Sequence, residues 1–341
     1  MKNKDSELVQ RQLVVSVDTE EEGLWNNVYS TTGNTTENLR GLARFQATCE
    51  SHSMAPTYVI DAPVLCDELA IADLRRWQDA GTCEVGTHCH PWCNPPLPIE
   101  PVQAVDSFLC NLPPEVQRAK LEWLTDAISD AMGRRPTSYR AGRYGFDDES
   151  AMILDELGYV VDSSVLPVYD YRSYGGPNFN QYARTPYRYF GNDKSQGLIE
   201  IPVTAGFTRA GFESQRRLWL GLRKNLWSKF RVAGIADRLR IAKRVKLTPE
   251  GTTLRDLKDL IDSCVADGLS TLVLMLHSSS LVAGFSPYAK DEEALDQLYQ
   301  RLTGTFQYAI ERHGFAPATL TQAAENIAPS LPFEKNEFES T

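Results

Sequence analysis

Short apolar runs alternate with longer amphipathic stretches along most of the chain, and this alternation is the strongest constraint on its fold. Runs of this length bounded by turn residues are typical of buried strands, and the stretches between them are typical of helices. Strands that alternate with helices pair in parallel, most simply in a barrel. We therefore predict an α/β fold. The expected strands lie at 13–17, 56–61, 83–88, 137–140, 159–163, 198–203, 270–277 and 316–320.

The chain reads as one domain with appended segments. Its 341 residues are enough for one large domain, and no internal repeat is visible. We place an N-terminal extension at 1–12, the barrel at 13–325, a basic helical insertion at about 207–248 and a polar tail at 326–341. The stretch 169–197 is rich in Tyr, Asn and Gly, and we expect it to be a long covering loop.

The overall charge and apolar pattern exclude several classes of protein. Lys and Arg number 35 against 45 acidic residues, a formal net charge of -10, so we expect no nucleic-acid partner. The sequence has neither an apolar run long enough for a transmembrane helix nor an apolar signal core after Met1, and we therefore expect a cytoplasmic protein. Seven cysteines in this length fit a reduced compartment better than a disulfide scaffold.

One segment departs from the acidic average. Residues 209–246 contain twelve Lys or Arg and two acidic residues. Trp219, Leu222, Leu226 and Phe230 are spaced for one apolar helical face among basic ones. This pattern fits a solvated surface helix packed on the barrel, or a cap that contacts an anionic glycan or a membrane surface.

Polar residues gather at the predicted strand ends, where parallel α/β folds place their sites. Asp18 and Glu20 leave an extended strand on the same side, and so do His88 and His90. Two imidazoles and a carboxylate form a plausible site for a divalent ion, and a second carboxylate could accept a proton from water. The strand-end residues are Asp18, Glu20, His88, His90, Arg140, Asp162 and His277.

Two further segments suggest catalytic groups. The turn 138–145 follows a strand, and its backbone N–H groups could face an oxyanion. His277 follows a very apolar run and could be a general acid if an acidic neighbour, for which Asp162 is the candidate, keeps it protonated.

Two other kinds of site use the same residues. Cys83, Cys89 and Cys93 flank the histidines and allow a structural zinc site, although they contain no C-x-x-C pair. Ser278 or Ser279 beside His277 would suit a Ser-His-Asp hydrolase, but a G-x-S-x-G turn is absent from the sequence.

Five motifs in order resemble the polysaccharide deacetylase family, the NodB-homology carbohydrate esterases, and most of all its cytoplasmic lipopolysaccharide- or capsule-associated members. The resemblance covers about 13–325 and implies a distorted (β/α) barrel of about seven strands. The motifs are VDTE at 17–20, EVGTHCHPW at 84–92, YRAGRYG at 139–145, VDSSV at 161–165 and LMLHSS at 274–279.

The resemblance also implies roles for these residues. Asp18 resembles the catalytic base, and Arg140 the arginine that steadies it. The backbone N–H of Tyr144 resembles the oxyanion donor. His277 resembles the general acid, with Asp162 supporting its charge. The implied metal ligands are Glu20, His88 and His90.

The metal set departs from the usual family pattern in two ways. The Asp18-x-Glu20 spacing leaves open which of the two acids binds the metal and which accepts the proton, and the second histidine stands at a different position. In that pattern the second metal histidine stands four residues after the first, a position held here by Trp92, and His90 is the nearest substitute. Zinc suits two imidazoles and one carboxylate, while cobalt, nickel and manganese are alternatives.

The function implied is a metal-dependent hydrolase that removes an N-acetyl group from an amino sugar of a glycan or lipopolysaccharide precursor. Loop aromatics that could stack on a sugar are Trp25, Trp92, Tyr171 and Tyr174. Two alternatives are a C–N hydrolase that acts on a non-sugar amide, with or without metal, and a catalytically inactive glycan-binding barrel.

Overall fold

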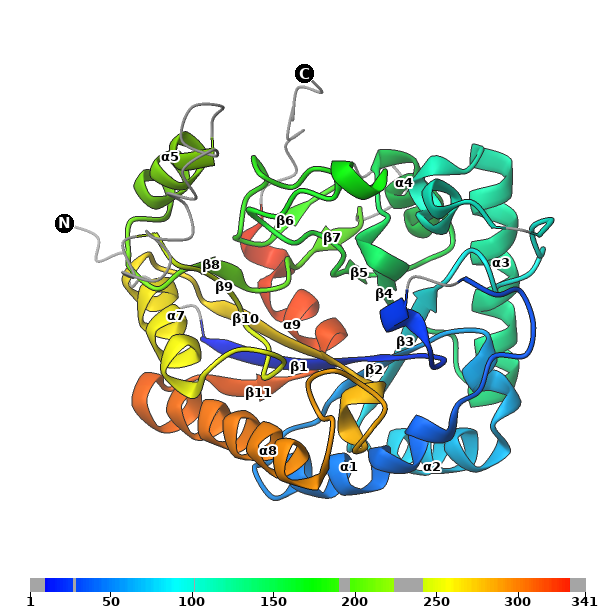
Figure 1. The fold of residues 1–341 in the computed structure, drawn as a ribbon, viewed down its shortest axis with the longest axis horizontal. Helices are drawn as coiled ribbons and strands as arrows, with labels where there is room; N and C mark the ends of the chain where they lie inside the picture. Colours follow the sequence, from blue (N-terminus) through cyan, green and yellow to red (C-terminus); the bar gives the residue numbers. More distant parts are fainter. Residues whose placement is uncertain (1–9, 27–28, 101, 190–196, 224–241, 332–341) are drawn as a thin grey trace.

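A curled, mostly parallel sheet forms the centre of the computed structural model, which describes residues 10–26, 29–100, 102–189, 197–223 and 242–331 (Figure 1). Its strand order is β10-β1-β2-β3-β4-β5-β7-β6, with β11 paired to β1. The strands are β1 (Gln12–Thr19), β2 (Thr57–Ile60), β3 (Glu84–Cys89), β4 (Ser138–Ala141), β5 (Val161–Asp162), β6 (Tyr187–Arg188), β7 (Ile199–Glu200), β10 (Thr271–His277) and β11 (Ala316–Ala318).

The sheet curls so that its two sides approach each other. β6 is antiparallel to β7, whereas the other ladders of this sheet are parallel. After β7, the N–H of Thr204 donates to the carbonyl of Val273 on β10 at 3.2 Å. The N–H of Met275 donates to Leu247 at 3.1 Å. These bonds bring the chain after β7 back to β10, which confirms the predicted distorted barrel.

The alternation of side chains along β1 separates an outer from an inner face. Leu13, Val15 and Val17 belong to the large apolar core beneath the surrounding helices, while Val14 belongs to a separate core. Asp18 shares the face of Val14 because the side-chain period of a strand is two. The inner face of β1 therefore changes from apolar to charged toward its carboxyl end.

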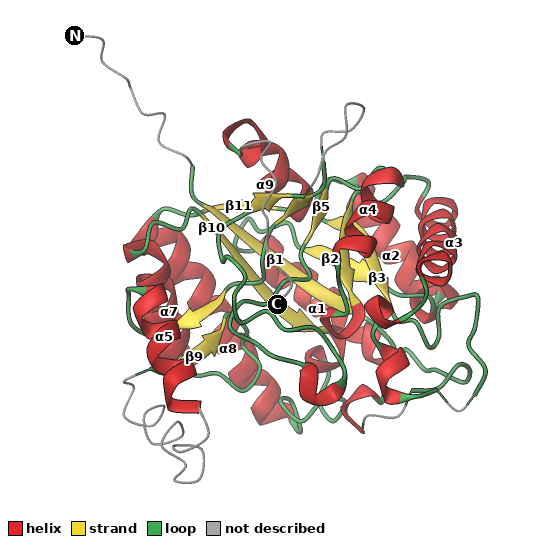
Figure 2. Ribbon diagram, turned by 90° about the horizontal axis from the view of Figure 1, so that it is seen from above, coloured by secondary structure: helices red, strands yellow, loops and turns green. Residues whose placement is uncertain are grey.

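Helices surround the sheet on the outside (Figure 2). Asp67, Asp147, Thr253 and Asp291 each accept a backbone N–H bond at a helix start, which ends the preceding loop at that residue. The outer helices are α1 (Leu42–Glu50), α2 (Glu68–Asp79), α3 (Pro114–Met132), α4 (Asp148–Glu156), α7 (Leu254–Ala266) and α8 (Glu292–Gln307). No helix in the described residues is both long and apolar enough to cross a membrane.

One helix fills the opposite end of the barrel from the charged residues. The strand expected at 316–320 ends at Ala318, and Thr319 forms a capping box that starts α9 (Leu320–Ile327). Leu320 of α9 packs with Val14 and other apolar side chains of the inner face. The sequence analysis missed α9, which includes the first residues of the predicted tail.

The predicted basic insertion contains a small appended unit. β8 (Ala205–Phe207) pairs antiparallel with β9 (Arg244–Lys246), and α5 (Phe212–Arg223) packs on this pair through buried Phe212 and Trp219. In Figure 1, α5 lies at the upper left of the molecule, above α7. Leu226 and Phe230 of the predicted apolar face lie outside the described residues.

Candidate metal and catalytic centre

The carboxyl ends of several strands meet at a small cavity of about 120 Å³. Asp18 and His277 are register partners at the ends of the neighbouring strands β1 and β10, and His88 and Arg140 are partners on β3 and β4. The structure therefore brings together most of the strand-end residues that the sequence singled out. The cavity is lined by Asp18, Glu20, Leu24, Trp25, His88, His90, Ala141, Arg143, Tyr144 and His277.

Asp18 lies between two cationic side chains. Its Oδ1 accepts a bond from a terminal guanidinium nitrogen of Arg140 at 2.6 Å, and its Oδ2 lies 3.9 Å from Nε2 of His277. Burial alone would raise the pKa of Asp18, but the charge of Arg140, followed by those of His88 and His277, lowers it to about 2. Asp18 is therefore ionised at neutral pH.

Arg140 is itself completely buried and fixed by its neighbours. Its Nε donates to the carbonyl oxygen of Ser163 at 2.8 Å, and its other terminal nitrogen donates to the hydroxyl of the same residue at 3.1 Å. These bonds leave the guanidinium one orientation, toward Asp18.

Glu20, His88 and His90 form a compact cluster of metal-binding atoms. Oε2 of Glu20 lies 3.3 Å from Nε2 of His88 and 3.4 Å from Nε2 of His90. Nδ1 of His88 donates to the backbone carbonyl of Arg140 at 2.9 Å, which directs its Nε2 into the cluster. The three side chains are buried and their ligand atoms lie close enough to share one ion.

A second buried group holds His90 from behind. Nδ1 of His90 donates to Oε2 of Glu21 at 2.8 Å, and Oδ2 of Asp61 lies 3.3 Å from the same nitrogen. Trp92 stacks on the His90 ring at 4.2 Å between ring centroids, and its Nε1 donates to Oε1 of Glu21 at 2.7 Å. Trp92 therefore helps to orient His90 from the position where the family usually has a histidine.

Glu250, and not Asp162, is the acidic partner of His277. Oε2 of Glu250 accepts from Nδ1 of His277 at 2.9 Å, and Oε1 accepts from the backbone N–H of His277 at 3.0 Å. Burial opposes protonation of the ring, but the charges of Glu250, Glu20 and Asp18 together with this hydrogen bond raise the pKa of His277 to about 9. The imidazole is thus a cation at neutral pH.

The predicted support of His277 by Asp162 is wrong because Asp162 has other partners. Its two carboxylate oxygens accept from the hydroxyl and the N–H of Ser164, at 2.6 and 3.0 Å. Glu200 is its register partner on β7, and both side chains are fully buried. Burial and the charge of Asp162 raise the pKa of Glu200 well above its ordinary value. This pair belongs to the barrel wall beneath Arg140.

The predicted turn lies beside the cluster, and two of its residues have left-handed backbone angles. Arg143 and Tyr144 both have positive φ, at 54° and 60°, and both line the cavity. Gly142 precedes them, and a β-carbon at this position would overlap the imidazole of His90 and lie 2.5 Å from the carbonyl oxygen of Cys89. The absence of a side chain at 142 is therefore what allows this close approach. The role of the Tyr144 N–H stays a prediction.

The three cysteines and two serines considered in the sequence analysis do not form one site, although Cys93 lies with Glu21, Asp61 and His90 in a second group of potential metal ligands. Sγ of Cys83 contacts the carbonyl of Leu74, while Sγ of Cys93 lies 3.6 Å from Glu21. The hydroxyl of Ser278 accepts the N–H of Glu20, and the hydroxyl of Ser279 accepts Nε1 of Trp25. Both hydroxyls thus fix the rim of the cavity.

The candidate aromatic residues lie in different surroundings. Trp25 lines the cavity with its ring edge-on to His277, at 5.2 Å between centroids. Trp92 is buried, Tyr171 stacks on Tyr144, and Tyr174 is exposed. Trp25 is therefore the aromatic residue best placed to contact a ligand in the cavity.

Glu21, Asp61 and Glu250 were missed as site residues. Asp61 is the last residue of the predicted strand 56–61, and this signal could have placed it at the same edge. Glu21 stands within an acidic run, where nothing in the sequence distinguishes it from its neighbours. Glu250 lies in a loop after β9, a strand of only three residues that the sequence pattern does not predict.

The fold is shared with solved structures over nearly the whole chain. One is a protein from Mycobacterium smegmatis provisionally named polysaccharide deacetylase, with a TM-score of 0.56 and 15% identity over 98% of this chain and 96% of that one. Another is PuuE allantoinase, with a TM-score of 0.51 and 14% identity over 95% and 92%. These likenesses define the α/β class of the chain.

A sequence profile described as polysaccharide deacetylase matches residues 33–161. This segment contains His88, His90 and Arg140, and the match is to the family that the motifs resemble. No curated protein matches the sequence.

Proposed function

We propose that the protein is a metal-dependent hydrolase that removes the N-acetyl group from an amino sugar. The observation that carries this proposal is the arrangement around one cavity of an ionised Asp18, the Glu20–His88–His90 cluster and a protonated His277. An amide hydrolase needs a group that accepts a proton from water and a group that protonates the leaving amine. In this cavity Asp18 is the group that accepts a proton and His277 is the group that donates one.

The donor atoms of the cluster fit a divalent ion. Glu20, His88 and His90 would hold the ion, and the Nδ1 bonds of both histidines leave their Nε2 atoms directed toward Glu20. A bound divalent ion would act as a Lewis acid that lowers the pKa of water and polarises a carbonyl group. Zinc is the metal that we propose, because it favours imidazole and carboxylate ligands.

The side chains divide the proton transfers between them. Asp18 accepts a proton from the attacking water, and Arg140 keeps its carboxylate ionised and oriented. His277 donates its Nε2 proton to the leaving amine, because Glu250 holds its Nδ1 and keeps the ring protonated. The turn at Tyr144 places backbone groups beside the cavity, where an N–H would stabilise the oxyanion.

The proposed substrate is an N-acetylated glycan or a lipopolysaccharide precursor in the cytoplasm. Trp25 offers an aromatic face at the cavity rim for a sugar ring. The basic segment 209–246 is proposed as a peripheral contact for an anionic glycan or a membrane surface. Arg216 in its described part pairs with Glu213, so this contact would use other cations of the segment.

The experiment is to offer N-acetylhexosamine glycans to the purified protein and to measure acetate release with added Zn²⁺, with a chelator, and after Zn²⁺ is restored. We expect release that the chelator stops and that Zn²⁺ recovers. Asp18→Asn and His277→Ala should each lower the rate by about 10²–10⁴-fold. Acetate release from no glycan, or wild-type rates in both variants, would contradict the proposal.

A further inference from the structure

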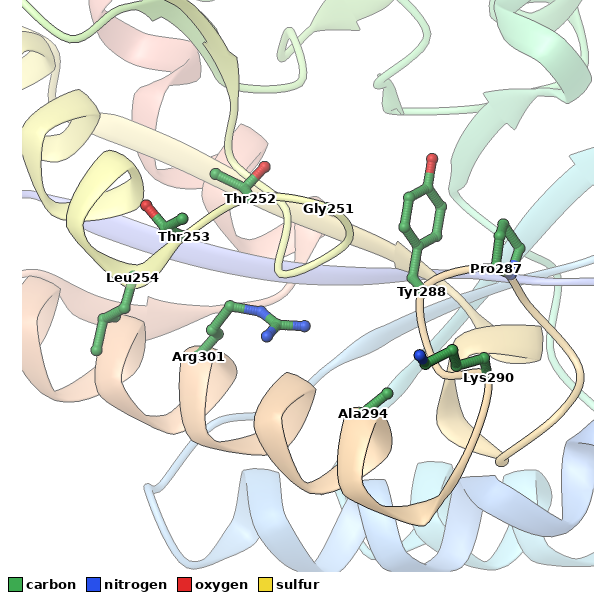
Figure 3. Close-up of a pocket in the computed structure, with 9 residues that line it drawn as sticks. All are labelled: Gly251, Thr252, Thr253, Leu254, Pro287, Tyr288, Lys290, Ala294 and Arg301. Atoms are coloured by element: carbon green, nitrogen blue, oxygen red, sulfur yellow. The ribbon is translucent and has the colours of Figure 1, made fainter. Parts of the chain in front are cut away.

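A larger cavity of about 560 Å³ lies on the far side of the loop that carries Glu250. Gly251, Thr252 and Thr253 form its upper wall and directly follow Glu250, while Ala294 and Arg301 of α8 form its lower wall. Figure 3 shows the side chains of Lys290 and Arg301 extending toward one another in the space between this loop and α8. Two cations therefore converge on one cavity.

Neither cation is strongly neutralised by the described residues. Nε of Arg301 donates to the carbonyl of Pro249 at 2.9 Å, and within the described ranges its guanidinium forms no ion pair. Burial lowers the pKa of Arg301. Lys290 has a 3.9 Å contact with the adjacent Asp291, where both side chains are exposed, and such pairs are weak.

The charge of the cavity wall is therefore positive. The polar residues of its described lining are these two cations and the hydroxyl-bearing Thr252, Thr253 and Tyr288. None of the described lining residues carries a carboxylate. A guanidinium and an ammonium group that converge in a cavity recognise an oxyanion, such as a phosphate or a carboxylate.

The cationic cavity and the catalytic one are linked through shared lining residues. Lys290 and Pro287 line both this cavity and a second one of about 740 Å³, which in turn shares Trp25 with the catalytic cavity. The rings of Trp25 and Tyr288 meet edge-on at 5.3 Å between centroids. A chain of sugar rings could thus run from His277 across Trp25 to Lys290.

We infer that the Lys290–Arg301 cavity is a subsite for an anionic group on the glycan substrate, a phosphate or a carboxylate, located along the chain from the sugar that is deacetylated. This inference rests on the proposed function for the identity of the substrate. It is distinct from the basic segment 209–246, since neither cation belongs to that segment. The subsite selects substrates and takes no part in bond cleavage.

The test compares three matched oligosaccharides of N-acetylglucosamine, one neutral, one with a terminal phosphate and one with a uronic acid. Calorimetric affinity and acetate release are measured in parallel with the full chain. We expect the wild type to bind one or both anionic ligands about tenfold more tightly than the neutral one, the size of one charge-assisted contact. Comparison of the phosphate and the carboxylate identifies the preferred group.

The variants separate this subsite from the catalytic residues. Lys290→Gln should abolish most of the preference, taken as the ratio of anionic to neutral affinity within each variant, and Lys290→Glu should reverse it. Arg301→Lys retains a charge and should lose part of the preference. The control Arg312→Gln removes an exposed cation beyond the other end of α8 and should have no effect.

The outcomes also separate the two proposals. A wild type without anionic preference, or a preference that Lys290→Glu leaves intact, overturns the subsite even if acetate is released from every ligand. An anionic preference that Lys290→Glu reverses, in a protein that releases acetate from none of the ligands, supports the subsite and contradicts the deacetylase proposal.

Discussion

The carboxylate of Glu250 accepts two hydrogen bonds from His277, one from the ring Nδ1 at 2.9 Å and one from the backbone N–H at 3.0 Å. A side chain held at both points cannot rotate its ring without breaking a hydrogen bond to a buried carboxylate, which is a costly loss. The pair therefore fixes which nitrogen of His277 faces Asp18.

Replacement of Glu250 by Gln should shift the pH dependence of activity. The raised pKa of His277, about 9, keeps the ring protonated at neutral pH, and this proton is lost as the pH rises through that value. Loss of the neighbouring charge should lower the pKa by about one to three units, so the alkaline limb of the kcat profile should move by that amount to lower pH. Asp162→Asn is the matched control, and a larger shift in that variant would contradict the assignment to Glu250.

The ion pair between Asp18 and Arg140 should stabilise the fold as a unit. Arg140→Met leaves the buried carboxylate of Asp18 without its partner, and breaking such a pair costs about 3–5 kcal/mol of unfolding free energy. The double variant Asp18→Asn/Arg140→Met should recover part of this loss in urea unfolding. Arg44→Met, which removes an exposed pair with Asp296, should cost about 1 kcal/mol or less. A double variant no more stable than Arg140→Met would argue against the pairing.

Metal affinity should depend on the residues behind His90. Glu21→Gln weakens the acceptor of the His90 Nδ1–H bond, and loss of such a partner typically lowers metal affinity by about 10–100-fold. Trp92→Phe retains an aromatic ring on His90 but removes the bond to Glu21, so its effect should be smaller. Competition with a chromophoric zinc chelator measures both affinities. Trp77→Phe, on the outer helix α2, should leave the affinity unchanged.

The free energy of unfolding should decrease as the pH rises because of the buried pair of Asp162 and Glu200. The raised pKa of Glu200 means that the folded protein keeps a proton that the unfolded chain loses above the ordinary value of 4.5. The stabilisation is complete below that value and is lost as the pH rises toward the folded-state pKa. Arg140 on β4 faces the pair and reduces the effect without reversing it.

Glu200→Gln should therefore flatten this dependence. Urea unfolding between about pH 5 and pH 8 should give a wild-type slope steeper by up to about 1.4 kcal/mol per pH unit, the value for one proton. Parallel slopes in the two proteins would show that the pair does not hold a proton.

Much of the fold and the catalytic cavity could be predicted from the sequence because both depend on strand ends. The long apolar runs of β1 and β10 mark their strands clearly, and the polar residues that follow them meet at one edge. Asp162 also follows a strand at this edge, but its bonds to Ser164 and its pairing with β7 depend on register, which strand positions alone do not give.

The parts that escaped prediction depend on short or irregular segments. Glu250 reaches His277 from a loop after a three-residue strand, so its position depends on tertiary packing. The helix α9 has eight residues and directly follows a short strand, and its apolar side chains continue the apparent strand pattern. Lys290 and Arg301 converge only because α8 begins beside the loop at Gly251.

The missing side chain at Gly142 links two motifs that are about fifty residues apart. The imidazole of His90 and the backbone carbonyl of Cys89 both occupy the space of a β-carbon there, so a side chain cannot be added at 142 while both stay in place. Any relative with alanine at the equivalent of 142 must shift the backbone at the equivalent of 89 and also move or replace the histidine at the equivalent of 90. A side chain at 142 in a diverged barrel would therefore mark a rearranged backbone beneath the ion-binding ring.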